Sequence, residues 1–299
     1  MKSKIISATV VGAIITFGFA VKLSAQDDIL GPPIPPPKGH ICHIANTAFM
    51  VEIGSKKILF DAMLDDGLPT YGKPSQSDQL AIEWGQKPFD GVDLVFSSHR
   101  HGDHFSPIAT LRHMQMNTAA RYIMTPEAEE ELRALAAPGY DPDRIVNGPV
   151  PTGQSAIYEL DGMDVRLFGI SHGDNAGNPT QNLGLMVTVE GTSFFHPGDM
   201  SSDLILLQSA GLDGLKVDYL MMPYWYLMGD GRREVVSAAW DFKHIIPMHV
   251  PVDEQNWMED YGGLEGVTDN VYDSFPGKLV KLDAGKSGQI KCLNLPLGY

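Results

Sequence analysis

The sequence predicts an α/β protein in which two β-sheets pack together with helices on their outer faces. The 299-residue chain runs through a β-rich segment, an alternation of strands and helices, a second β-rich segment and a second alternation. A sheet must bury its apolar face against another layer, so two packed, antiparallel-dominated sheets with helices outside satisfy this order. In addition, polar residues stop several apolar strands abruptly, and α/β proteins place their chemistry where strands end.

In the first half, three strands come first, and Gly54-Ser55 is the expected turn between the second and the third. The elements expected here are strands at 40–44, 48–53, 57–60, 92–98 and 121–124 and helices at 77–85, 105–116 and 126–136. Pro126 suits the first position of the last of these helices, and Thr125 suits its N-cap.

In the second half, Gly191 is the expected turn between two strands. The elements expected here are strands at 155–160, 164–170, 183–190, 192–196, 219–222 and 244–248 and helices at 202–210 and 232–241. The tail reads as a closing hairpin of 278–282 and 289–293. Two long loops, 62–76 and 251–275, could cover a site. The second loop contains three candidate contacts, Trp257, Tyr261 and Tyr272.

Residues 1–25 are expected to be a secretory signal peptide. Lys2 and Lys4 give a positive start, an apolar run follows at 5–21, and small residues stand before Gln26. A run of about 17 apolar residues also fits an uncleaved membrane anchor, which is the alternative. Cleavage before Gln26 would release a periplasmic or secreted protein without a stable membrane anchor.

The mature chain is expected to be a Pro-rich linker at 26–39 followed by one domain at 40–299. Proline-rich segments are extended rather than packed. The chain has 22 Lys and Arg against 37 Asp and Glu, a net charge of −15. Loss of the three lysines in residues 1–25 would leave −18. So acidic a chain repels phosphates, and no nucleic-acid partner is expected.

The two cysteines, Cys42 and Cys292, lie near opposite ends of the chain. An exported protein meets oxidising conditions, which favour a disulfide between them. Two buried thiols are the alternative, because the sequence does not give the distance between the two Cα atoms.

The clearest chemical signal is the segment SSHRHGDHFS at 97–106, between an apolar strand and a helix. Within six positions it has four side chains that can bind a metal, namely His99, His101, Asp103 and His104. A solvated, histidine-rich loop is the alternative. One loop rarely completes a metal site, so further ligands are expected where later strands end. Three such residues stand beside turn formers, namely His172, Asp199 and His249.

These motifs, together with Asp61 in ILFDAM, resemble those of the metallo-β-lactamase superfamily in type and in order. They span residues 61–249. The segments FHPGD and HIIPMH are similar to its branch of ascorbate-6-phosphate-lactonase-like, metal-dependent hydrolases. The resemblance implies that residues 40–299 form a four-layer αββα sandwich, with two mixed sheets inside and helices outside.

The resemblance also implies a site with two divalent metal ions. Six ligands divide into His99, His101 and His172 for the first ion and Asp103, His104 and His249 for the second. Asp199 would bridge the two ions. Zinc is the expected metal for an imidazole-rich site with carboxylates, and manganese or iron are alternatives. Asp61 would accept a hydrogen bond from a ligand histidine or from the motif loop.

The implied activity is hydrolysis of a small-molecule phosphoester, ester or lactone by a hydroxide that bridges the two metals. Asp199 argues against a β-lactamase, because the class B enzymes lack the bridging aspartate. Either Asp103 or a metal-bound water could pass a proton to the leaving group, and Asp61 joins the catalytic residues through its support of the ligands. A β-lactamase, a non-catalytic metal-binding protein on the same fold and a single-iron redox enzyme are the alternatives.

Four residues are candidate substrate contacts. Tyr224 and Tyr226 follow the strand at 219–222 and could form an aromatic wall, with core packing as the alternative. Arg232 begins a helix and could hold an anionic group, or it could lie on a solvated helix face. His196 could touch the substrate or pack behind the ligands.

Overall fold

The structure is a computed structural model that describes residues 39–64, 68–146, 150–173, 180–201, 208, 210–285 and 288–295. The chain divides into two compact units, 1–36 and 37–299, and all described residues belong to the second. The expected signal peptide and nearly all of the expected linker and of the expected helix at 202–210 lie outside the described residues. Within the described part, no helix has both the length and the apolar character needed to cross a bilayer.

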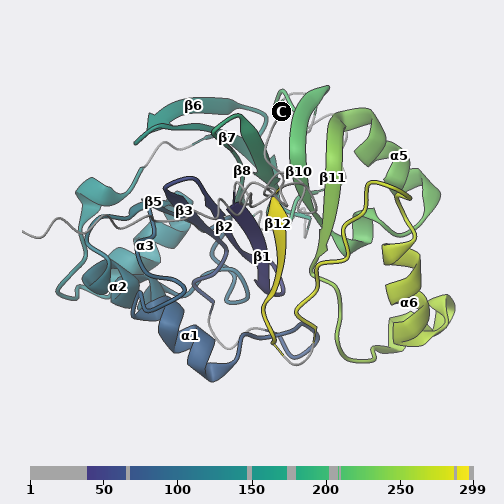
Figure 1. The fold of residues 1–299 in the computed structure, drawn as a ribbon, viewed down its shortest axis with the longest axis horizontal. Coiled ribbons are helices and arrows are strands. Elements are labelled where there is room, and N and C mark those ends of the chain that lie inside the picture. Colours follow the sequence, from purple (N-terminus) through teal and green to yellow (C-terminus); the bar gives the residue numbers. More distant parts are fainter. Residues whose placement is uncertain are drawn as a thin grey trace, which may run out of the picture. The chain divides into compact units, whose positions relative to one another are not determined.

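The first of two sheets combines both ends of the described chain (Figure 1). Its spatial order is β12-β1-β2-β3-β4-β5. Its strands are β1 (Gly39–Ala45), β2 (Ala48–Ile53), β3 (Lys56–Phe60), β4 (Leu94–Phe96), β5 (Arg121–Ile123) and β12 (Lys291–Leu295). The pairs from β12 to β3 are antiparallel, and β3, β4 and β5 are parallel, so the sheet is mixed.

The second sheet has the order β11-β10-β9-β8-β7-β6. Its strands are β6 (Ser155–Leu160), β7 (Met163–Ser171), β8 (Gln181–Val189), β9 (Thr192–His196), β10 (Leu215–Pro223) and β11 (Trp240–Met248). The strands from β6 to β9 are antiparallel neighbours, and β9, β10 and β11 are parallel. This sheet is therefore mixed as well.

Helices cover the outer face of each sheet. Three helices pack on the first sheet, namely α1 (Gln76–Glu83), α2 (Pro107–Met116) and α3 (Pro126–Ala134), and two pack on the second, α5 (Asp230–Ala239) and α6 (Gly263–Tyr272). Short 3-10 helices occur at η1 (Pro142–Arg144), η2 (Tyr224–Tyr226) and η3 (Asn256–Tyr261). The predicted four-layer sandwich with helices outside is confirmed.

The alternation of side chains along each strand explains how the four-layer sandwich contains three apolar cores. Along β2, Phe49 and Val51 face the second sheet, whereas Met50 between them packs under the helices of the first sheet. Successive side chains of a strand point to opposite faces, so a continuous apolar run serves two cores. A third core fills the space between the second sheet and its helices and includes Val236 of α5 and Val267 of α6.

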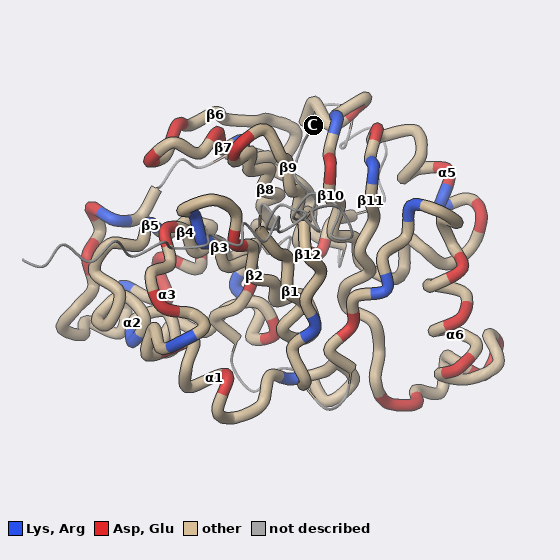
Figure 2. The backbone as a smooth tube through the Cα atoms, in the orientation of Figure 1, with Lys and Arg blue, Asp and Glu red and all other residues tan. Residues whose placement is uncertain are grey.

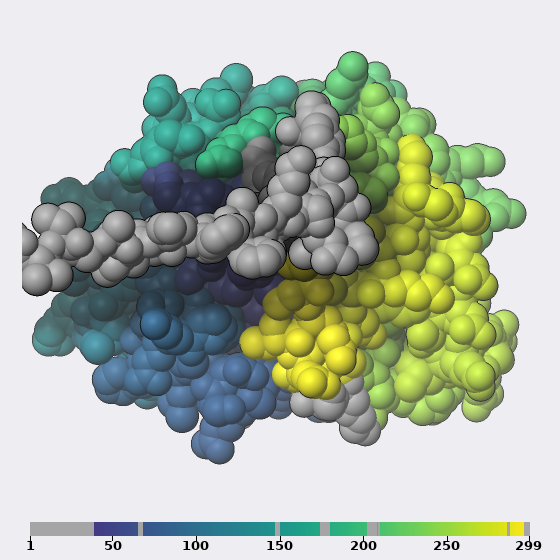
Figure 3. All heavy atoms as spheres, viewed as in Figure 1, coloured from purple at the N-terminus to yellow at the C-terminus, as the bar shows by residue number. Residues whose placement is uncertain are grey.

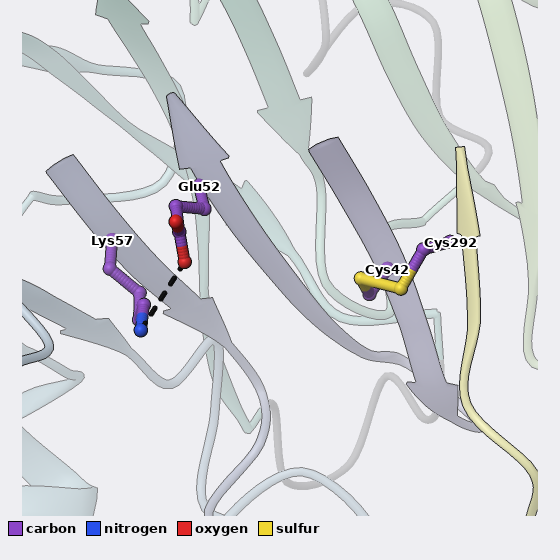
Figure 4. The surroundings of a disulfide bond; sticks show 4 residues. All are labelled: Cys42, Glu52, Lys57 and Cys292. Atoms are coloured by element: carbon purple, nitrogen blue, oxygen red, sulfur yellow. Dashed lines mark ion pairs between the residues drawn. A yellow bond between two sulfur atoms is a disulfide. The ribbon is translucent and has the colours of Figure 1, made fainter. Parts of the chain in front are cut away.

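The chain ends meet in the first sheet. Cys42 of β1 and Cys292 of β12 are opposite in register, and a disulfide joins them across Cα atoms 4.0 Å apart (Figure 4). The structure therefore contains the disulfide rather than two thiols. In Figure 4, Glu52 and Lys57 of neighbouring β2 and β3 form an ion pair of 3.3 Å. Figure 3 shows the C-terminal segment lying against the segment that contains β1.

The predicted closing hairpin of the tail is wrong. Residues 278–282 form only an isolated bridge, in which Leu279 pairs with Ile245 of β11. The segment expected at 289–293 is instead β12, which pairs with β1 in the first sheet, whereas β11 belongs to the second sheet. Alternation of apolar residues indicates a strand, but it does not identify the partner of that strand. The region 251–275, expected to be a loop, contains η3 and α6.

Candidate metal centre

The candidate ligands lie at one edge of the sandwich because each follows the end of a strand. His99 comes soon after β4, His172 directly after β7, and His249 directly after β11. Backbone hydrogen bonds tie these loops together: the N–H of Gly173 donates to the carbonyl of Asp199 (2.8 Å), and the N–H of His249 donates to that of Asn46 (3.2 Å). The two sheets therefore deliver their ligands to a common place.

A tight turn shapes the motif loop. The N–H groups of His104 and Phe105 both donate to the carbonyl of His101, at 2.9 and 2.8 Å. Ser106 then caps α2 by accepting a hydrogen bond from the N–H of Ala109. Because serine N-caps stabilise a helix start, the chain can leave the turn directly into the helix.

The first cluster consists of His99, His101 and His172. The Nε2 atom of His99 lies 3.1 Å from Nδ1 of His101 and 3.2 Å from Nε2 of His172. A tetrahedral ion with metal–nitrogen bonds of about 2.0–2.1 Å holds its ligand nitrogens about 3.3 Å apart. The three nitrogens therefore have the spacing that a common ion requires.

The second cluster consists of Asp103, His104 and His249. The Nε2 atoms of the two histidines are 2.9 Å apart. Oδ2 of Asp103 lies 3.7 Å from Nε2 of His104 and 3.6 Å from Nε2 of His249. Each of the three groups can offer a lone pair to a divalent cation that lies between them. This donor set fits a divalent metal.

Asp199 lies between the two clusters. Its Oδ1 is 3.1 Å from Nε2 of His249 and 3.4 Å from Nε2 of His104, whereas its Oδ2 is 3.8 Å from Nε2 of His172. Each carboxylate oxygen thus faces a different cluster. The loop of Asp199 is fixed by Asn182, whose Oδ1 accepts the N–H of Asp199 at 3.2 Å and whose amide donates to the carbonyl of Pro197 at 3.0 Å.

Gly198 allows this loop to pass close to Asn182. Its φ of 61° lies in the left-handed region, and a Cβ at this position would come within 2.1 Å of Oδ1 of Asn182. Only glycine adopts such a conformation freely and leaves room for so close an approach. The glycine in the HPGD segment therefore positions the aspartate that follows it.

Electrostatic interactions within the site shift three pKa values. Burial alone would raise the pKa of Asp199, but the imidazoles of His249 and His104 outweigh burial and hold it well below its ordinary value. Burial alone would lower the pKa of His104, but the carboxylates of Asp199 and Asp61 raise it well above the usual value. Burial, reinforced by nearby His104, lowers the pKa of His99 strongly, so this imidazole stays neutral and can bind a cation.

Asp61 supports the site from behind, as the resemblance implied. Its fully buried carboxylate accepts hydrogen bonds from the backbone N–H and the hydroxyl of Ser98, at 2.6 and 2.7 Å, and from Nδ1 of His104 at 2.7 Å. The last bond keeps the proton of His104 on Nδ1 and leaves Nε2 toward the clusters. Asp61 has a φ of 44°, a strained conformation for a non-glycine residue, and such strain is concentrated at functional sites.

Two candidate substrate contacts are inaccessible. His196 is fully buried, with Nε2 donating to the carbonyl of Thr47 (3.0 Å) and Nδ1 accepting the N–H of Gly198 (3.2 Å). Tyr226 is also fully buried, and its hydroxyl donates to the carbonyl of Met200 at 3.1 Å. Because neither side chain has exposed surface, the packing alternative describes both better than a substrate contact does.

The other two candidate contacts line a surface groove. Tyr224 is half-buried there, and Nη1 of Arg232 donates to the carbonyl of Trp225 at 2.9 Å. The ring centroid of Trp225 lies 5.3 Å from that of His249. This groove therefore lies beside the second cluster.

Tyr71 lies at the site although the motifs do not include it. Its ring meets that of His249 edge-on, with ring centroids 4.2 Å apart. Pairing with Pro251 holds Tyr71 there. The sequence gives one weak signal that Tyr71 could lie at the site: it is the only aromatic residue in the expected loop 62–76. The bridge to Pro251, which decides its position, leaves no trace in the sequence.

Comparisons with known proteins show which family the chain resembles. A family model described as a beta-lactamase superfamily domain matches residues 56–248. A UPF0173 metal-dependent hydrolase of Pyrococcus furiosus is 26% identical over 214 residues, which are 70% of this chain and 83% of the relative.

Solved structures share the fold at low sequence identity. Igni18, a metallo hydrolase of Ignicoccus hospitalis, has a TM-score of 0.50 and 15% identity, with 85% of this chain and 98% of that one covered. CmlA, a diiron beta-hydroxylase of Streptomyces venezuelae, has a TM-score of 0.55 and 14% identity, with 87% of this chain and 55% of that one covered.

Proposed function

Because the chain belongs to the β-lactamase superfamily and is a metal-dependent hydrolase, we propose that it holds two divalent metal ions and hydrolyses a small-molecule phosphoester, ester or lactone. The observation that carries this proposal is that the two oxygens of Asp199 face different clusters. His99, His101 and His172 would hold the first ion, and Asp103, His104 and His249 the second. Asp199 would offset the repulsion between the ions.

Two bound ions would supply Lewis-acid activation of water and of the electrophile, and would stabilise negative charge in the transition state. The residues of the chain prepare that chemistry. Asp61 holds the proton of His104 on Nδ1, so that Nε2 can act as a ligand. Asp103, which is 7% exposed, is the candidate for passing a proton to the leaving group, through the carboxylate oxygen other than the Oδ2 that faces the cluster.

Zinc is the metal we propose, since imidazoles dominate the donor set. Iron is the main alternative, because a protein with the same fold is a diiron hydroxylase. Protein purified without chelators should contain two zinc ions per chain by elemental analysis. It should also hydrolyse at least one class in a panel of chromogenic phosphodiesters, esters and lactones, with chelation abolishing the activity and added metal restoring it.

Two other results would contradict the proposal. Two ions per chain without hydrolysis anywhere in the panel would identify a non-catalytic metal-binding protein. One iron per chain would identify the redox alternative.

We also propose that residues 1–25 direct export and are removed before Gln26, leaving a linker at 26–39 and the hydrolase domain at 40–299 in the periplasm or medium. The Cys42–Cys292 disulfide supports export, because disulfides persist in oxidising compartments. Intact-mass measurement of the protein from the extracytoplasmic fraction should give an amino-terminus at Gln26. A full-length chain retained in membranes would instead identify an anchor.

A further inference from the structure

A groove of about 500 Å³ opens beside the second cluster. Its walls come from η2, the start of α5 and η3, which are separate segments of the chain. Its aromatic lining consists of Tyr224, Trp225, Trp257 and Tyr261. Two charged residues lie at the same groove: Asp230, which pairs with Arg233 at 3.6 Å, and Arg232, which donates to the Trp225 carbonyl. Aromatic faces therefore dominate its chemistry.

The four rings form one connected array. Tyr224 and Trp257 are stacked, with centroids 5.9 Å apart and planes at 21°. Trp225 meets Tyr224 edge-on at 5.4 Å, and Tyr261 meets Trp257 edge-on at 6.1 Å. Aromatic pairs prefer such stacked and edge-to-face arrangements. An incoming flat ring could extend the array in either way.

Two rings of this array stay open to solvent. Trp257 is 41% exposed and Tyr261 is 47% exposed. Both belong to η3, whose neighbouring residues Glu259 and Asp260 are acidic, and neither η3 nor α6 contains a Lys or Arg (Figure 2). Large apolar surface left open beside a cavity and bordered by polar residues is typical of a ligand-binding site.

The groove lies close to the candidate metal centre. The Trp225 ring lies between them, 5.3 Å from that of His249 and 5.4 Å from that of Tyr224. Arg232 holds this wall by its bond to the Trp225 carbonyl. Tyr71 also packs against His249, with ring centroids 4.2 Å apart. The aromatic array thus lies one ring away from a ligand of the second cluster.

We propose that this groove is a substrate subsite for a flat aromatic ring, attached to the group that is hydrolysed at the metal centre. The inference rests on the proposed function, since it names the class of substrate for the same site. Trp257 and Tyr261 would be determinants of specificity, and they need not touch the reacting atoms.

The test measures binding of three inert phosphonates to the metal-loaded protein by calorimetry. Phenylphosphonate has the flat ring, cyclohexylphosphonate has similar bulk without flatness, and methylphosphonate has neither. We expect phenylphosphonate to bind about five- to tenfold more tightly than methylphosphonate, with the cyclohexyl compound between them. In Trp257→Ala the phenyl-to-methyl ratio should fall about three- to tenfold, and in Tyr261→Ala about threefold. Trp84→Ala is the matched control, because Trp84 is 45% exposed at the end of α1 and should leave the ratio unchanged.

The ratio separates this inference from the proposed function. A ratio near one in the wild-type protein, no measurable binding of phenylphosphonate, or equal binding of the cyclohexyl compound would overturn the subsite even if esters are hydrolysed. A ratio that Trp257→Ala does not change would also overturn it. Conversely, a phenyl-to-methyl ratio that falls in Trp257→Ala and Tyr261→Ala but not in Trp84→Ala would support the subsite, even if the protein hydrolyses no substrate in the panel.

Discussion

Replacing Asp199 with alanine is expected to lower kcat/KM by about three orders of magnitude or more. Its two oxygens face both clusters, so its loss would weaken both metal positions and leave their charges unbalanced. A loss of about 4 kcal/mol of transition-state stabilisation corresponds to about a thousandfold in rate. His101→Ala, which removes a nitrogen of the first cluster, should have an effect of similar size. Steady-state kinetics on the best substrate and elemental analysis of each variant measure both consequences.

A variant with a smaller expected effect and a control variant strengthen this test. Asp61→Asn weakens the acceptor of the Nδ1–H of His104 without removing a ligand, and loss of such a supporting bond costs about 10- to 100-fold in metal affinity or activity. Asp218→Asn is the control, because Asp218 bonds Ser193 and Lys243 and has no contact with the clusters. Unchanged turnover in both Asp199→Ala and His101→Ala would refute the proposed site.

Breaking the Cys42–Cys292 disulfide is expected to lower the free energy of unfolding by about 5 kcal/mol. The bond closes a loop of 250 residues in sequence, and the chain-entropy model assigns a loop of that length a large stabilisation. Cys292→Ser is the preferred variant, because Cys292 is exposed whereas Cys42 is fully buried. Denaturant unfolding of the wild-type protein with and without reductant, compared with the variant, measures the loss.

The control for this prediction lies within the same experiment. Reductant should shift the unfolding midpoint of the wild-type protein and leave that of Cys292→Ser unchanged. Equal midpoints for oxidised and reduced wild-type protein would show that the bond does not stabilise the fold.

Much of the fold could be predicted because its signals are local. Gly54 and Gly191 mark turns between apolar runs, and the caps Ser106 and Thr125 begin helices where polar residues meet apolar ones. The candidate ligands could be selected for a related reason. A histidine or aspartate that follows a buried strand lies at the sheet edge, and Asp199 illustrates this three residues after the end of β9.

The features that could not be predicted depend on contacts between distant segments. The partner of β12 is β1, about 250 residues away, and Tyr71 reaches His249 through a bridge to Pro251. His196 and Tyr226 lie next to functional segments in sequence, but their side chains point into the cores. For such residues, distance along the chain from a motif does not determine accessibility.

The position of β12 at the edge of the first sheet has a consequence for biosynthesis. A ribosome synthesises Lys291–Leu295 only after all the other described strands. Until these residues have been made, β1 therefore lacks its outer neighbour in the sheet. Until then β1 presents an open ladder of amide and carbonyl groups, which can recruit strands from other molecules. Nascent or prematurely terminated chains are therefore the species most vulnerable to intermolecular pairing.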